Sequence, residues 1–284
     1  MSRQTCNICP HHCTLEEGES GYCCARSNHD GEIRNDNYGM VTLLSLDQIE
    51  KKSLRRFYPG SRVLSVGSYG CNLRCPFCQN YAISMADGMH AGAQYIPPED
   101  LVRRAGEYEP AGNIGLAFTY NEPVVGYEYV RDCARLAARR GFHTVLATNG
   151  YICEQPLGEL LPYINAMCID LKGFSEASYS RLGGDLKTVC STIETAARCC
   201  HVEVTVLVIP GENDTPGQMR RLSSWLAGIS PEIALHINRF FRIFTWRTAR
   251  PRRSMLCFHS RMWRAGRFHM SMWEAVRANK QDCK

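Results

Sequence analysis

The sequence predicts an α/β protein built on a parallel sheet, either open or curled into a barrel. Short apolar segments alternate along the chain with segments of helical length. Most of the apolar segments contain few polar residues, as is typical of parallel strands that are covered on both faces. At 284 residues, the chain is long enough for one large barrel or two modest domains with a sizeable core.

Six segments have the β-branched and apolar composition of buried strands. They are residues 62–67, 114–118, 143–148, 166–171, 202–209 and 233–237. Three of the intervening segments carry helix signals: 97–108 opens with Pro and acidic residues, 122–141 ends on Arg-Arg-Gly, and 214–228 begins with Asp, Thr and Pro and ends with Gly. Strand and helix repeat through six strands, which predicts the parallel arrangement.

The first 35 residues are short of apolar side chains and rich in Cys, Gly and His, which predicts a loop-built knuckle. Four cysteines fall within 18 residues of this segment: Cys6, Cys9, Cys13 and Cys23. Four soft ligands at this spacing suit tetrahedral zinc or an auxiliary [4Fe–4S] cluster, and the sequence leaves the choice open. A site of three cysteines with His11 or His12 is the less favoured alternative. The expected domains are 1–35, 36–241 and an aberrant basic tail, 242–284.

The charge is divided unevenly along the chain. The formal net charge is +5, but residues 242–284 hold eleven basic and two acidic side chains, which leaves −4 for residues 1–241. We therefore infer no nucleic-acid partner from the total. No window approaches ~18 consecutive apolar residues, and no apolar signal region opens the chain, so we expect a cytoplasmic protein without a membrane partner. Its 16 cysteines then indicate metal or redox chemistry rather than disulfides.

Glycine and polar residues follow directly after the predicted strands. In parallel barrels the chemistry lies on the loops after the carboxyl ends of the strands, so we expect one site along this rim. The first such loop carries Cys71, Cys75 and Cys78 at the spacing C-x3-C-x2-C, and no further cysteine follows until Cys133. Gly70, within the loop, permits a sharp backbone bend.

Three thiolates can hold three irons of a [4Fe–4S] cluster and leave the fourth iron open to another ligand. The alternatives are a three-cysteine zinc site completed by a distant histidine, or chance in a cysteine-rich chain. The position of the motif after the first strand, with the aromatic Phe77 between its last two cysteines, favours the cluster.

The segment "CNLRCPFC" resembles the signature of radical S-adenosylmethionine (SAM) enzymes, in which the amino and carboxyl groups of SAM chelate the open iron. With "CNICPHHCTLEEGESGYC", "FTYNEP", "VLATNGY", "IDLKGF", "VLVIPGENDT" and "LHINRFF", residues 6–241 resemble the AmmeMemoRadiSam-system radical enzymes, a branch similar to the pyruvate formate-lyase-activating enzymes. The resemblance implies a partial (β/α)6 TIM-like barrel. It also implies cleavage of SAM to methionine and a 5′-deoxyadenosyl radical, which abstracts hydrogen from a partner protein or a small molecule.

The resemblance also implies roles for single residues. Phe77 is expected near the adenine, and Asn121 and Glu122 are expected to hold the methionine amino group, where a carboxylate suits an ammonium. Asp170 and Lys172 match an element in which both residues approach the cofactor. Alternatively, Asn121 and Glu122 cap the following helix, and Asp170 and Lys172 form a structural ion pair.

Three further residues are candidates from their positions in the predicted strands. Thr148 and Asn149 follow the third strand, where they would contact the ribose or carboxylate of SAM or form a simple turn. His236 lies inside the sixth strand, as a substrate contact or as a buried histidine satisfied by its neighbours.

The expected partners are an electron donor such as ferredoxin or flavodoxin and a protein substrate, with glycyl-radical generation as one activity that the resemblance suggests. The name of the family indicates association with Memo-like and Ammecr-like proteins. Two other functions stay open: a non-catalytic metal-binding adaptor, and an inactive product of an altered gene.

The alternating pattern ends after Phe241, where the tail gains Trp, Met and Arg and loses acidic residues. Codons for residues 242–279 can be chosen so that the adjacent frame encodes a Pro-rich turn, an apolar-periodic helix and a "VHVGSC" ending, much like the C-terminus of the family. We therefore predict a frameshift, in the gene or in its sequencing, near Phe241 and Arg242. Sequencing both strands of the source DNA would test this.

Overall fold

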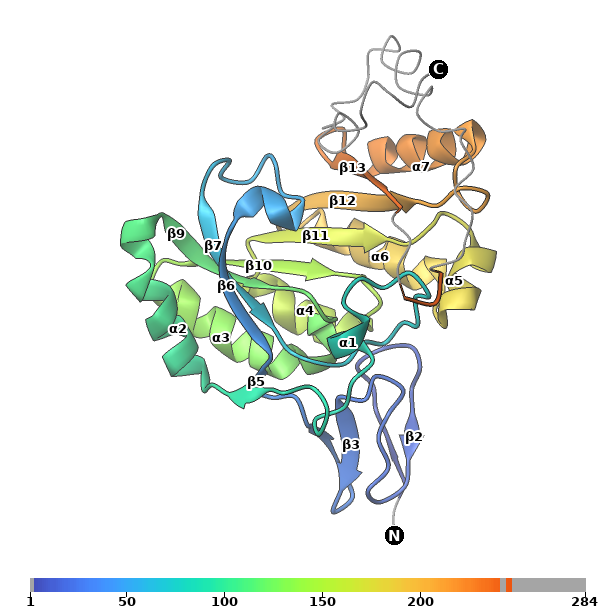
Figure 1. Cartoon of the computed structure of the whole chain (residues 1–284). Helices are drawn as coiled ribbons and strands as arrows, with labels where there is room; N and C mark the ends of the chain where they lie inside the picture. Colours follow the sequence, from blue (N-terminus) through green and yellow to red (C-terminus); the bar gives the residue numbers. More distant parts are fainter. Residues whose placement is uncertain (1–2, 241–243, 247–284) are drawn as a thin grey trace.

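The computed structural model describes residues 3–240 and 244–246, and Figure 1 traces the chain. Its centre is a seven-stranded sheet with the strand order β13-β12-β11-β10-β9-β7-β6. The parallel strands are β7 (Arg62–Gly67), β9 (Asn113–Phe118), β10 (His143–Thr148), β11 (Ala166–Leu171), β12 (His201–Val208) and β13 (Ala234–Arg239). They correspond to the six predicted segments, so the α/β class with a mostly parallel sheet is confirmed. In the described part of the chain the sheet stays open between β13 and β6.

One edge of the sheet was not predicted. Strand β6 (Leu43–Gln48) pairs antiparallel with β7, so that Leu43 lies opposite Gly67 and Gln48 opposite Arg62. Because β6 runs the other way, it delivers the following helix η1 (Ile49–Lys52) to the amino ends of the parallel strands. The ends of the molecule's central sheet therefore carry different segments: the cysteine loop after β7 at one end, and η1 at the other.

The larger helices lie along one face of the sheet, with α2, α3, α4 and α6 behind it in Figure 1. They are α2 (Pro98–Glu107), α3 (Tyr127–Arg139), α4 (Glu154–Leu160), α5 (Glu176–Leu182), α6 (Leu186–Ala196) and α7 (Pro216–Ile229). Helices α2, α3 and α7 match the three predicted helical segments. The short elements are α1 (Tyr81–Ser84), β5 (Met40–Val41), β8 (Gln94–Tyr95), η2 (Glu109–Ala111), η3 (Pro123–Gly126), η4 (Leu161–Tyr163) and η5 (Phe244–Trp246).

Side chains alternate between the two faces of the strands, and both faces are covered. One set packs with the helices in the main core and includes Leu116, Leu146 and Ile169. The other set packs against the segment that begins at η1 and includes Val63, Ala117, Val145 and Cys168. Ile49, Leu54 and Phe57 supply the apolar side chains of that segment. Burial on both faces explains why the strand segments are almost continuously apolar.

The N-terminal segment contains two short hairpins rather than loop alone. Strand β1 (Gln4–Thr5) pairs with β2 (Thr14–Leu15), and β3 (Arg26–His29) pairs with β4 (Glu32–Asn35). A partly buried ion pair ties this segment to α3, because the Arg26 guanidinium donates to the Glu128 carboxylate at 2.6 and 2.8 Å. The knuckle is therefore anchored on the sheet-and-helix unit.

Two predictions reach beyond the described residues. Apart from residues 244–246, the tail 242–284 lies outside them, and so does the frameshift predicted near Phe241 and Arg242. Within the described ranges, no helix combines the length and the apolar character needed to cross a membrane.

Candidate active site

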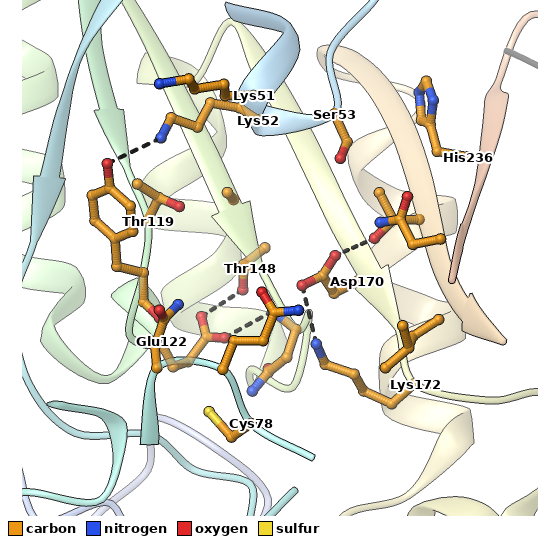
Figure 2. Close-up of a pocket in the computed structure, with 18 of the residues that line it drawn as sticks. Lys51, Lys52, Ser53, Cys78, Thr119, Glu122, Thr148, Asp170, Lys172 and His236 are labelled. Atoms are coloured by element: carbon orange, nitrogen blue, oxygen red, sulfur yellow. Dashed lines mark hydrogen bonds and ion pairs between the residues drawn. The ribbon is translucent and has the colours of Figure 1, made fainter. Parts of the chain in front are cut away.

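A cavity of about 1110 Å³ is lined by residues from the loops after the parallel strands and by η1. Figure 2 shows the labelled residues in order from one end of this cavity to the other: Cys78, then Glu122, Thr148, Asp170 and Lys172, and finally Lys51 and Lys52. Cys71, Cys75 and Phe77 line the cavity as well. The strand-end loops therefore bring most of the predicted site residues to one space.

The cysteine loop is held by Asn121 from the neighbouring strand end. The Asn121 side-chain amide donates to the carbonyl oxygens of Tyr69 and Gly70 at 2.9 and 3.2 Å. Its side-chain oxygen accepts from the Ser68 backbone N–H at 2.9 Å. Because the side chain of Asn121 is occupied by loop backbone on both sides, it fixes the start of the loop that carries Cys71.

Two of the clustered thiols, those of Cys71 and Cys75, lie where ionisation is unfavourable. Burial raises the pKa of Cys75 to about 11, although the positive charge of Lys172 opposes the shift. Burial, followed by the negative charge of Glu122, raises the pKa of Cys71 as well. Iron binds thiolates, so loading a cluster here must release protons.

The donor set fits an iron–sulfur cluster that has one open iron. Across residues 3–240 and 244–246, no three or more His, Cys, Asp or Glu side chains are arranged to hold one metal ion. Thiolates that each bind a different iron of a cluster need not converge on one point. Cys71, Cys75 and Cys78 supply three soft ligands from one loop at the cavity wall, which is the set that a cluster with one open iron requires.

Glu122 is a buried carboxylate between two strand ends. Its oxygens accept from Thr148 Oγ1 at 2.6 Å, from the Asn149 N–H at 2.7 Å and from the Val124 N–H at 3.2 Å. Burial raises the pKa of Glu122 to about 7, against the effect of these hydrogen bonds. The bond to Val124 is the predicted helix cap, and the other two place Thr148 and Asn149 against the same carboxylate.

Asn149 connects this carboxylate to the cysteine loop. Its side-chain amide donates to Asn72 Oδ1 at 2.9 Å and lies 3.8 Å from the sulfur of Cys71. Asn72 in turn donates to the carbonyl oxygen of Tyr151 at 2.6 Å. The strand-end position of Asn149 therefore has a structural consequence beyond a turn, because it holds the segment between Cys71 and Cys75.

Asp170 and Lys172 form the predicted ion pair. The Lys172 ammonium donates to Asp170 Oδ2 at 3.0 Å, and Thr205 Oγ1 donates to Asp170 Oδ1. Burial lowers the pKa of Lys172, but the negative charge of Asp170 outweighs it, and the net shift is upward. Lys172 thus remains a cation beside Cys75.

His236 lines the cavity, and the carboxylate of Glu203 holds its ring in place. Its Nε2 donates to Glu203 at 2.5 Å, and the fully buried Glu203 also accepts from His201 Nε2 at 2.9 Å. The backbone N–H groups of Arg55 and Arg56 complete the set at 3.0 and 2.8 Å. Burial raises the pKa of Glu203, but these hydrogen bonds outweigh it and hold it at about 2.

The four knuckle cysteines line a second space of about 10 Å³ together with His11 and His12. Burial raises the pKa of Cys9 to about 12 and that of Cys23 to about 11, while backbone N–H groups of His11 and Ala25 act in the opposite direction. As in the rest of the described chain, these side chains are not arranged around a single metal position. A tetrahedral ion would require the four sulfurs to draw together.

Several residues at or beside the cavity were not predicted from the sequence. Asp47, Lys51, Lys52, Tyr120 and Thr205 line it, whereas Asn72 and Glu203 bond to the lining residues Asn149 and His236. Tyr120 and Asn72 lie within the motifs quoted above, next to residues that were predicted. The sequence therefore did indicate that they lie near the site. Asp47 and Glu203 depend on contacts between distant parts of the chain, which no local pattern indicates.

The comparisons with known proteins agree with this site. Residues 65–222, more than half of the chain, match the Radical SAM superfamily. The chain is 37% identical over 237 residues to "Uncharacterized protein MJ0808" of Methanocaldococcus jannaschii, covering 83% of this chain and 70% of that protein. The chain therefore belongs to the radical SAM superfamily, whose chemistry depends on a [4Fe–4S] cluster and SAM.

More distant relatives include named enzymes. The chain is 27% identical over 174 residues to the pyruvate formate-lyase 1-activating enzyme of Escherichia coli K12, covering 59% of this chain and 69% of that one. It is 25% identical over 177 residues to the pyruvate formate-lyase-activating enzyme of Clostridium pasteurianum, covering 60% and 71%. These matches confirm the predicted resemblance to the superfamily and to the activating enzymes.

Among solved structures, Streptococcus suis SuiB bound to S-adenosylmethionine superposes with a TM-score of 0.56 at 12% identity. The match covers 75% of this chain, which spans about half of the SuiB chain, 50%. At this identity the likeness shows the shared fold alone.

Proposed function

We propose that this protein is a radical SAM enzyme of the activating-enzyme type, which abstracts a hydrogen atom from a partner protein or a small molecule. When bound, the cluster and SAM supply the chemistry: one-electron cleavage of SAM yields methionine and a 5′-deoxyadenosyl radical. The similarity to two pyruvate formate-lyase-activating enzymes supports the subtype. The observation that carries the proposal is the gathering of three thiols from one loop, with Glu122 and Lys172, at one end of a large cavity.

The residues have separate roles in this proposal. Cys71, Cys75 and Cys78 hold three irons, and Asn121 and Asn149 fix the loop that carries them. Glu122 binds the methionine ammonium, because Oε2 has the Asn149 N–H as its protein donor and a carboxylate oxygen accepts more than one.

The remaining predicted residues contribute through position and charge. Phe77, buried beside the cysteines, provides an apolar surface for the adenine. Thr148 orients Glu122 through its hydroxyl. Lys172 keeps a positive charge next to Cys75, and Asp170 fixes its position. His236 lines the cavity wall, away from the cysteine loop.

The test is anaerobic reconstitution with iron and sulfide, followed by measurement of 5′-deoxyadenosine after dithionite and SAM are added. The wild type should form deoxyadenosine and the Cys75→Ala variant should not. Cys199→Ala, which changes an exposed thiol, is the matched control and should keep the activity. Equal deoxyadenosine yields from the Cys75 and Cys199 variants would refute the proposed site.

We also propose that Cys6, Cys9, Cys13 and Cys23 hold a second metal, with zinc and an auxiliary cluster as the two alternatives. The support is the donor set and its proximity to the cysteine loop, where His11 Nε2 donates to the Asn72 carbonyl oxygen at 2.8 Å. An external donor such as ferredoxin or flavodoxin would supply the electron. The iron and zinc contents per chain are measured in the wild type and in Cys6→Ser, and the metal that the variant loses is the one that the knuckle binds. Equal metal contents in the two proteins would exclude a metal site at these cysteines.

A further inference from the structure

The end of the cavity away from the cysteines carries two lysines that the proposed reaction does not use. Lys51 and Lys52 are the last residues of η1, at the amino ends of the parallel strands. Figure 2 shows both at the opposite end of the cavity from Cys78. They line the same continuous cavity as the three cysteines.

Both ammonium groups share one carboxylate. Lys51 Nζ lies 2.9 Å from Asp47 Oδ1, and Lys52 Nζ lies 2.9 Å from Asp47 Oδ2. Asp47 also accepts from Tyr120 Oη at 2.7 Å and from Ser45 Oγ at 3.3 Å. Two cations and one anion leave a net charge of +1, and each ammonium has three N–H donors, more than these contacts use.

The other charged groups at this end do not change that balance. Glu50 and Arg55 also line the cavity, and their charges are opposite. Glu50 Oε1 accepts from the Gly60 backbone N–H at 2.7 Å, and the opposite charges of Glu50 and Arg55 cancel in the sum. The cavity is therefore positive at the η1 end.

Lys52 is held in a fixed, enclosed position. Its side chain is 4% exposed, and its ammonium lies 4.5 Å from the centre of the Tyr120 ring and 3.4 Å from Tyr120 Oη. Burial lowers the pKa of Lys52, against the hydrogen bond and charge of Asp47. A second anion at this position would therefore stabilise the charged form further.

Tyr120 joins the lysines to the cysteine end. Its backbone has a φ of +76°, an unfavourable conformation for a tyrosine, which persists where the surroundings fix it. Its carbonyl oxygen accepts from the Asn80 side chain, just after Cys78, at 2.7 Å. Its hydroxyl donates to Asp47. The cation site is thus rigidly connected to the loop where the reaction begins.

Short side chains, including Thr119, Ala147 and Thr205, are among those that line the cavity. Asp47 lies opposite Val63, four residues before the end of β7 at Gly67. At about 3.3 Å per residue, this separates the levels of the two ends by about 13 Å. A small molecule can therefore contact the lysines at one end and extend toward the cysteines at the other.

We propose that Lys51 and Lys52 bind an anionic oxygen group, a carboxylate or a phosphate, of an acidic small molecule from which hydrogen is abstracted. This rests on the proposed function and specifies its substrate class. The enclosure of Lys52 favours a small molecule, because a bulky protein surface could not reach an ammonium that is almost fully covered.

The test is a lysine footprint of the reconstituted protein, with SAM present and at constant ionic strength. An N-hydroxysuccinimide ester acetylates exposed lysines, and peptide mass spectrometry gives the rate at each. Lys51 is the reporter, because its side chain is 65% exposed. Lys187, exposed on α6, is the control. The added probes are inorganic phosphate and acetate, with chloride as the reference salt.

We expect phosphate or acetate to slow acetylation of Lys51 and to leave Lys187 unchanged. A probe at twice its Kd fills about two-thirds of the sites, which slows the reaction about threefold. Stronger protection by phosphate would assign a phosphoryl group, and stronger protection by acetate a carboxylate. If neither protects Lys51 more than chloride does, the anion site is overturned.

Two variants separate charge from folding. Lys52→Met should abolish the protection of Lys51, and Lys52→Arg, which keeps the charge, should retain it. If Lys52→Met fails to fold, the wild-type footprint and its comparison with that of Lys52→Arg still test the anion site. Deoxyadenosine formation is measured separately on the same preparation. If deoxyadenosine forms but no probe protects Lys51, the anion site alone is refuted. If a probe protects Lys51 but no deoxyadenosine forms, the proposed function alone is contradicted.

Discussion

The backbone N–H of Cys71 donates a hydrogen bond to the carbonyl oxygen of Cys23, at 3.2 Å. This bond joins the N-terminal knuckle directly to the loop that carries the three clustered cysteines. Gly70, next to Cys71, allows the approach, because its backbone passes so close to Cys23 and Ala25 that a side chain would not fit. The conformation of the cysteine loop therefore depends on the knuckle.

Gly70→Ala should destabilise the protein by about 2–4 kcal/mol, from a strained backbone and an overpacked contact. Gly70 has a φ of +86°, and an added Cβ would lie 2.6 Å from the Cys23 carbonyl oxygen and 2.7 Å from the Ala25 Cβ. Denaturant unfolding measures the loss. Gly112→Ala is the matched control, because Gly112 has a φ of +85° and an added Cβ would meet nothing within 4 Å.

Gly112→Ala should lower the free energy of unfolding by only about 1 kcal/mol, because only its backbone conformation is unfavourable for alanine. The difference between the two variants reports the packing of the knuckle on the loop. Equal losses would contradict that packing.

Glu122 should make the stability of the metal-free protein fall as the pH rises. Its pKa is about 7 when folded, against 4.5 for an ordinary glutamate side chain. Between these values the folded state holds a proton that the unfolded state has released, so unfolding becomes easier with rising pH. The loss should approach about 3 kcal/mol, at 1.36 kcal/mol per pKa unit.

Thermal unfolding between pH 4.5 and pH 7 measures this dependence. Glu122→Gln should flatten the pH profile, whereas Glu107→Gln, on the exposed side of α2, should leave its slope unchanged. A wild-type slope in Glu122→Gln would show that another group is responsible.

Glu203→Gln should destabilise the protein by about 2–3 kcal/mol, because an amide leaves buried N–H donors without an acceptor. Glu203 accepts from two histidines and from the backbone N–H groups of Arg55 and Arg56 while fully buried. Glu232→Gln, at a carboxylate that is 78% exposed, is the control for denaturant unfolding. Indistinguishable midpoints would mean that Glu203 does not anchor the segment after η1.

Lys172→Met should slow deoxyadenosine formation at least about tenfold, which corresponds to about 1.4 kcal/mol. The variant removes the cation beside Cys75 and leaves Asp170 without its partner. Iron per chain is measured first, so that rates are compared at equal loading. Lys187→Met, on the exposed side of α6, should keep the wild-type rate. An unchanged rate in the fully loaded Lys172 variant would remove Lys172 from the site.

The parallel strands could be predicted because each is apolar on both faces. Residues 143–148 and 166–171 were predicted with the bounds that β10 and β11 have. Strand β6 was missed because its pairing with β7 is antiparallel and its composition is mixed. Helices α5 and α6 did carry a signal, since Ser175 and Asp185 cap them by accepting from the N–H groups of Ser178 and Thr188.

One part of the candidate site could likewise be predicted from the sequence, and another part could not. The cysteine motif and the polar residues that directly follow the strands predicted that Glu122, Thr148 and Asn149 lie close together. Their hydrogen bonds show that they do. The η1 end of the cavity could not be predicted, because its contacts are long-range. Tyr120 and Asp47 lie 73 positions apart in sequence, and no local pattern indicates that they meet.

The most direct measurement is electron paramagnetic resonance of the reconstituted, dithionite-reduced protein before and after SAM is added. We expect the signal of a reduced [4Fe–4S] cluster whose g values change when SAM binds the open iron. The variant with Cys71→Ala, Cys75→Ala and Cys78→Ala should lose that SAM-dependent change, whatever metal the knuckle holds. A cluster signal that SAM leaves unaltered in the wild type, or one that the triple variant retains in full, would contradict the assignment of these three cysteines.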